Sequence, residues 1–138
     1  MLEDPLLEDL LLGSRAELLR FANVLDSERP GLVTTVTETT SSPRASSQRL
    51  QIAAGSQRVS VDIVIGTRVW WDKTVQWHVV SGIALGGGED DDPCGPDLAI
   101  AIGESTVNRA RRFADWLEDL GPFLAKWQPE VLAALERR

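Results

Sequence analysis

The sequence predicts an α+β fold in which helices cover one face of an antiparallel sheet. Helical apolar spacing is confined to the two ends of the chain, within residues 6–25 and 105–135. Residues 32–83 are rich in Val, Ile and Thr and alternate as half-buried strands do. Tight turns separate these strands, so sequence neighbours run antiparallel. We expect a sheet of about five strands, with an N-terminal helix and two C-terminal helices packed on its apolar face.

Length and composition favour a single domain over residues 1–138. The chain is 43% hydrophobic and 25% charged, which is ordinary for a globular protein with its own core. One cysteine cannot form an internal disulfide, and the acidic first nine residues do not resemble a secretory signal. We therefore expect a cytoplasmic protein. No apolar run approaches the ~20 residues of a membrane helix, so we expect no membrane contact.

The N-terminal segment has two helical stretches around a glycine. Leucines at 6, 7, 10 and 11 give one apolar turn, and Gly13 then interrupts the pattern. Ser14 followed by Glu17 matches a capping box, in which the serine begins a helix and the glutamate reaches back. The sequence therefore predicts a helix from about Arg15 to Leu25, with a short helix before it.

The middle of the chain predicts hairpins. A first strand covers residues 32–40, and a turn at 41–44 follows. Gly55-Ser56 is typical of a two-residue hairpin loop, which pairs Ile52 with Val59 and Leu50 with Val61. Paired residues point to the same side, so both apolar sets fall on one face of the sheet.

The next hairpin surrounds Trp70 and Trp71. A two-residue turn at 72–73 would place Trp77 opposite Arg68 and so mix polar and apolar residues on one face. A three-residue loop over 72–74 preserves the face, and it pairs Trp71 with Val75 and Val69 with Trp77. We prefer this loop, or a bulge near Gly66 that would also keep the apolar residues of both strands on the same face.

The C-terminal third begins with a loop. Residues 86–97 are rich in glycine and acids, and we expect them to be flexible. A fifth strand over 98–102 leads to a helix capped by Ser105 or Thr106. Gly121-Pro122 is a stop signal, so a second helix carries the remaining apolar residues and is kinked or restarted at Pro129.

The second face of this sheet is the best candidate for binding. With the preferred register, Arg49 lies opposite Asp62, Arg68 opposite His78 and Trp70 opposite Gln76. Adjacent strand residues point to opposite faces, so Trp70 and Trp71 cannot both enter one core. Tryptophan and arginine are enriched at interface hot spots. The candidate binding residues are Arg49, Asp62, Arg68, Trp70, Gln76 and His78. The alternative is that a terminal helix or Arg68 shields Trp70.

Catalytic and metal chemistry have weaker support. His78 is the single histidine, and no nucleophile in a suitable context accompanies it. Cys94 lies among acids, which disfavour the thiolate. The acids at 89–92 match no calcium-loop spacing, so we expect no metal and no cofactor. The arginines at 109, 111 and 112 are expected to pair with acids of their own helix, such as Asp115 or Glu118.

Charge argues against nucleic-acid binding. The net charge is −7, and both ends of the chain are acidic while residues 31–85 are only mildly basic. By exclusion, we expect a small non-catalytic binding protein of a chaperone-like, immunity-like or adaptor type, with a protein partner or as a homodimer. The alternative is a small-ligand-binding protein or enzyme whose pocket is lined by Asp62, Arg68 and His78.

Overall fold

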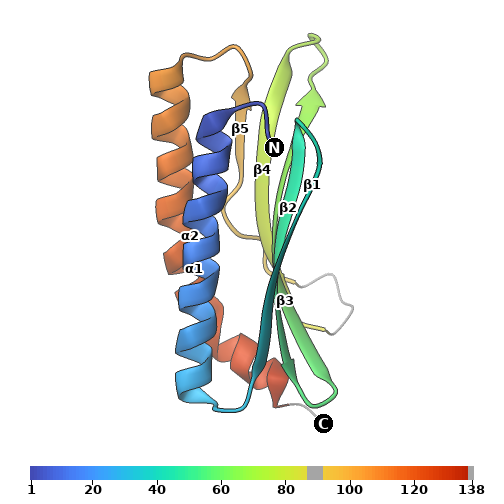
Figure 1. The fold of residues 1–138 in the computed structure, drawn as a ribbon, viewed down its shortest axis with the longest axis vertical. Coiled ribbons are helices and arrows are strands. Elements are labelled where there is room, and N and C mark those ends of the chain that lie inside the picture. Colours follow the sequence, from blue (N-terminus) through green and yellow to red (C-terminus); the bar gives the residue numbers. More distant parts are fainter. Residues whose placement is uncertain (87–91, 137–138) are drawn as a thin grey trace.

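The computed structural model describes residues 1–86 and 92–136. Helix α1 (Pro5–Glu28) comes first, five strands follow, and helix α2 (Thr106–Leu135) ends the fold (Figure 1). Each strand pairs antiparallel with its sequence neighbour, in the order β1-β2-β3-β4-β5. The predicted α+β class and strand number are confirmed. The strands are β1 (Val33–Ser42), β2 (Ala45–Ala54), β3 (Gln57–Val69), β4 (Val75–Ala84) and β5 (Leu98–Ala101).

The two helices lie side by side and cover one face of the sheet (Figure 1). Alternate residues of β2, β3 and β4 meet the apolar stripes of α1 and α2 in one continuous core. Apolar burial of this kind is the main favourable contribution to folding. The largest fully buried side chains include Trp77, Leu18, Leu50, Ile63 and Leu120.

The prediction of two C-terminal helices was wrong. One helix of 30 residues, α2, runs through both Pro122 and Pro129. Each proline removes one intrahelical hydrogen bond, which ordinarily kinks or ends a helix. Here Leu120 and Leu124 are buried on either side of Pro122, so packing maintains the helix. The red last part of α2 turns toward the sheet, as expected of a helix bent by proline (Figure 1).

Helix α1 also begins earlier than predicted and is not interrupted. The Asp4 side chain accepts a hydrogen bond from the Leu6 amide, and Pro5 stands in the first turn. A Cβ at Gly13 would lie 2.4 Å from Leu117 Cδ2, so glycine permits close approach of α2 rather than ending the helix. Ser14 is buried inside α1, and its hydroxyl donates to Gln48 Oε1 at 2.6 Å.

The β2–β3 hairpin has the predicted register. Ile52 pairs with Val59 and Leu50 with Val61, and all four are buried. Gly55 has a φ of +61°, the left-handed conformation that glycine adopts without strain.

The β3–β4 hairpin has the predicted loop length but is displaced by one residue. Val69 pairs with Val75, and Trp70 N donates to Thr74 O at 2.9 Å, so the loop is Trp71–Lys73. Lys73 N donates to Trp70 O, and Lys73 has a φ of +69°. A type I turn followed by one left-handed residue is common in loops of this length. The paired residues of β3 and β4 keep the predicted alternation of faces but have different partners, and Trp71 falls in the loop.

The segment after β4 was predicted to be a flexible loop over 86–97. Residues 87–91 lie outside the described residues. Residues 92–97 follow the edge of β4: Ile83 N donates to Pro93 O at 3.0 Å, and Gly95 N donates to Ser81 O at 2.9 Å. Cys94 forms an isolated bridge with Gly82.

Candidate functional site

The candidate site is the sheet face opposite the helices, called the open face below. Paired residues in antiparallel strands point to the same side, so the register identifies its members. They are Val33, Thr35, Thr37 and Thr39 on β1; Ser47, Arg49, Gln51 and Ala53 on β2; Arg58, Ser60, Asp62, Val64, Gly66 and Arg68 on β3, with Trp70 after it; Gln76, His78, Val80, Gly82 and Ala84 on β4; and Ala99 and Ala101 on β5.

The centre of the open face holds an ion pair. Arg49 lies opposite Asp62, as predicted, and Arg49 Nε donates to Asp62 Oδ1 at 2.6 Å. Ser60 Oγ donates to the other carboxylate oxygen at 3.2 Å. The hydrogen bond to Asp62, together with its negative charge, raises the pKa of Arg49 above its ordinary value. Both side chains are partly solvated, so the pair contributes little to stability.

The tip of the β3–β4 hairpin is apolar and exposed. The Arg68 guanidinium carbon lies 4.4 Å from the centroid of the Trp70 ring, a cation–π contact. Trp70 is 40% exposed, Trp71 90% and Val69 66%. The tip rises beyond the N-terminal end of α1 (Figure 1). Neither tryptophan therefore enters the core. The register that we preferred from the sequence placed Val69 and Trp71 on the apolar face, and the structure leaves both exposed.

Gln76 lies opposite Arg68, in place of the predicted His78. Within residues 1–86 and 92–136, Gln76 Oε1 is the buried side-chain atom that has no hydrogen-bond partner. An acceptor buried in this way costs roughly 1–3 kcal/mol. The tip of the hairpin thus has both exposed apolar area and an unsatisfied polar atom.

His78 is half-buried and lies between two small residues. Its cross-strand neighbours are Gly66 and Ala99, and neither has a polar side chain. A general base needs a group within hydrogen-bond reach that orients it or receives its proton. These neighbours supply no such group.

The six predicted site residues form two separate groups. Arg49 and Asp62 are central, whereas Arg68, Trp70 and Gln76 are at the tip. Asp62 and Arg68 are six residues apart on β3, a span of roughly 20 Å at strand geometry. His78 lies between them. Five cavities occur among the described residues, and none of these five is lined by Asp62, Arg68 or His78.

Among the described residues, a shallow hollow of about 200 Å³ lies on the open face near the β2–β3 turn. Arg49 and Arg58 line it together with Gln51 and Ser60. Arg58 Nη1 is already bonded to the Gly55 and Gln57 carbonyl oxygens, at 2.6 and 2.9 Å. This volume is below the range of ordinary small-molecule sites. The open face is therefore mainly a broad surface.

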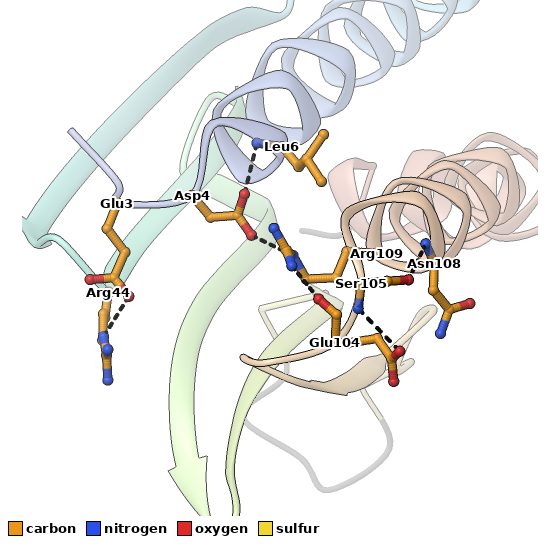
Figure 2. Close-up of polar contacts among 8 residues, drawn as sticks. All are labelled: Glu3, Asp4, Leu6, Arg44, Glu104, Ser105, Asn108 and Arg109. Carbon is orange, nitrogen blue, oxygen red and sulfur yellow. Dashed lines mark hydrogen bonds and ion pairs between the residues drawn. The ribbon is translucent and has the colours of Figure 1, made fainter.

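A second polar cluster joins the starts of both helices, and sequence reasoning missed it. Arg109 Nε donates to Asp4 Oδ2 at 3.0 Å, and Arg109 also donates to the Glu104 carbonyl (Figure 2). Ser105 caps α2, as predicted, by accepting from Asn108 N at 3.2 Å. Asp4 caps α1 with its other oxygen.

This cluster is structural. Asp4 and Arg109 are largely buried and satisfy each other, so removing either one would leave an unpaired charge. The predicted pairing of Arg109 with an acid of its own helix was wrong, because α1 brings Asp4 closer. Arg111 donates to Asn108 Oδ1 at 2.6 Å, not to Asp115 or Glu118. A separation of 105 residues hid the Asp4 contact from the sequence.

Two further observations concern metals and membranes. Within residues 1–86 and 92–136, no group of three or more His, Cys, Asp or Glu side chains could hold a metal ion. In the same part of the chain, no helix combines the length and apolar character that a membrane span requires. The acids at 89–91, which were considered for a divalent cation, lie outside the described residues.

Comparison with known proteins gave no match to a protein family model, a curated protein or a solved structure.

Proposed function

We propose that this protein is a non-catalytic binding protein of the chaperone, immunity or adaptor type, whose open face engages another protein. The observation that carries the proposal is the hairpin tip. Arg68 stacks on Trp70 at the end of the open face, next to the exposed Trp71 of the loop, and tryptophan and arginine are the residue types enriched at interface hot spots. Stacking holds the Trp70 ring before a partner arrives, which lowers the entropic cost of binding.

The shape of the open face supports a macromolecular partner. The five strands present a broad surface, and its hollow is smaller than an ordinary ligand pocket. The pair Arg49–Asp62 at its centre supplies both signs of charge, which favours orientation of a partner over raw affinity. The separation of Asp62, His78 and Arg68 gives no comparable support to a shared pocket.

The test is quantitative affinity capture with the tagged chain from its native cells. We expect a protein partner that wild type retains and that Trp70→Ala and Trp71→Ala each lose by at least about tenfold. Val107→Ala is the matched control, because Val107 is also an exposed apolar residue but lies on α2, away from the open face. Circular dichroism checks that each variant is folded. A partner retained equally by all variants would contradict the proposal.

A further inference from the structure

The two edges of the sheet differ in length and protection. β5 has four residues, whereas β1 has ten and carries no proline and no lysine. Every β1 residue is exposed except Val36, which is half-buried. Natural edge strands are ordinarily short or blocked by lysine, proline or a bulge, because their free backbone groups pair readily with another strand. The one irregularity of β1 lies between Thr40 and Ser42, so residues 33–40 form a regular free edge.

The backbone of this edge is not covered by another segment. In the described part of the chain, β1 pairs only with β2, and residues 33–40 make no other backbone–backbone hydrogen bond. The Thr39 carbonyl also accepts from Ser46 Oγ, which belongs to β2, at 3.2 Å. The outward-facing N–H and C=O groups of the strand are therefore available to a second strand.

We propose that β1 pairs antiparallel with β1 of a second copy of this chain, about a two-fold axis at Thr37. Residues 34–40 read Thr-Thr-Val-Thr-Glu-Thr-Thr, which is the same in both directions except for Val36 and Glu38. Symmetric pairing at Thr37 therefore places Thr37 opposite Thr37, Thr35 opposite Thr39 and Thr34 opposite Thr40 of the other copy. Cross-strand threonine pairs are favourable in antiparallel sheets.

Charge selects this register over its neighbour. An axis at Glu38 would oppose the carboxylates of the two copies, which is destabilising. With the axis at Thr37, Glu38 lies opposite Val36 of the other copy. Arg15 of α1 is 3.8 Å from Glu38 and offsets its charge. A strand with one acid thus avoids like-charge contact, although the whole chain has a net charge of −7.

Helix α1 supplies a second, independent observation. Arg15 reaches β1, and Leu12 and Leu19 lie three residues before and four after it, on the same side of the helix. Leu12 is 68% exposed and Leu19 45%, the largest exposed aliphatic side chains of α1. Pairing at β1 places the two copies of α1 on the same side of a continuous sheet, where these leucines lie toward the junction.

The pairing does not depend on the proposed partner of the open face, because it uses the edge of the sheet and the flank of α1. It joins two five-stranded sheets into one and makes the open faces of the two copies continuous. Its test is the oligomeric state, which is independent of Trp70.

The first measurement is light scattering coupled to size exclusion. We expect twice the chain mass of 15.1 kDa over the micromolar range.

A pair of variants tests the charge of the junction. Thr35 of one copy faces Thr39 of the other, so T35E/T39E places two pairs of like charges across the junction, and T35K/T39E places two pairs of opposite charges there. We expect T35E/T39E to weaken the dimer by about tenfold and T35K/T39E to preserve it. Far-ultraviolet circular dichroism checks folding of both.

The second measurement fixes the register. In a Cys94→Ser background, which removes the native free thiol, Thr37→Cys places two thiols across the axis. Antiparallel partners are close enough for a disulfide, so oxidation should give a covalent dimer. Thr39→Cys is the control, because its two copies lie roughly 13 Å apart in this register. The proposal is overturned if the folded wild-type chain is a monomer. It is also overturned if the chain is a dimer that T37C does not trap and T35E/T39E does not weaken. A monomer whose β1 edge pairs with a strand of another protein would overturn it as well.

Discussion

Ile63 and Val64 are neighbours on β3, yet Ile63 is fully buried and Val64 is 45% exposed. The difference recurs on β2 and β4, because within the described residues two helices cover one face of the sheet and no helix covers the other. On the covered face, shape and apolar area determine what a substitution does. On the open face, the same substitution changes mainly the exposed surface and has little effect on stability. The covered side of these strands therefore carries the stability, and the other side is the one where we propose that a partner binds.

The sharpest test of this comparison exchanges one tryptophan on each face for alanine. Trp77 is fully buried on the covered face, so Trp77→Ala should cost about 3–5 kcal/mol of unfolding free energy. Trp70 is 40% exposed and has one stacking contact, so Trp70→Ala should cost less than about 1 kcal/mol. Urea unfolding followed by circular dichroism measures both. Equal losses would remove the distinction between the faces.

A smaller effect is expected for two glutamines of β2. Gln48 is buried; it accepts from Ser14 Oγ and donates to the Leu11 carbonyl at 2.8 Å. Gln48→Leu should cost roughly 1–3 kcal/mol, because it removes two buried hydrogen bonds to α1 and leaves Ser14 Oγ with only its 3.1 Å contact to the Leu11 carbonyl. Gln51, on the open face, is exposed, and Gln51→Leu should stay within about 0.5 kcal/mol of wild type. Thermal unfolding compares the two variants. A large loss of stability for Gln51→Leu would contradict the expectation that only the glutamine on the covered face makes stabilising hydrogen bonds.

The smallest effect is expected at the exposed tip and depends on pH. Hydrogen bonds from Thr74 hold the pKa of Asp72 below its ordinary value of 3.8. The folded pKa is lower than the unfolded one, so this contribution is present above 3.8 and is lost as pH falls through the folded value. Asp72→Asn keeps an acceptor for the Thr74 amide but cannot titrate. The unfolding free energy, measured as a function of pH across this acidic range, should therefore have a different slope in wild type and in D72N. Parallel curves would show that Asp72 does not contribute to the pH dependence.

The sequence was informative wherever local chemistry and burial agreed. Gly55-Ser56 specified both a turn and a register that buries Ile52 and Val59, so the hairpin was predicted correctly. The next turn was displaced by one residue because Lys73 occupies a left-handed position that ordinarily favours glycine or asparagine. Nothing in the sequence around Lys73 signals that conformation.

Helix ends were mispredicted where tertiary packing overrides a local signal. Gly13 resembled a break but serves the close approach of Leu117, and Pro122 resembled a stop but lies between buried leucines. Asp4 followed by Pro5 is a typical helix start, but the helix was predicted from the spacing of apolar residues, which placed its start later. For the candidate site, alternation identified the residues of the open face, but the displaced turn changed which of them are neighbours.

The position of Cys94 has a practical consequence for studying the open face. Gly82 pairs with both Asp62 and Cys94, so the thiol extends the row of Arg49 and Asp62 across the sheet. It is exposed and is the single cysteine of the chain. A maleimide dye therefore attaches at one known point on this surface without any engineered residue. The native chain thus carries its own attachment point for a fluorescent reporter on the face where we propose that a partner binds.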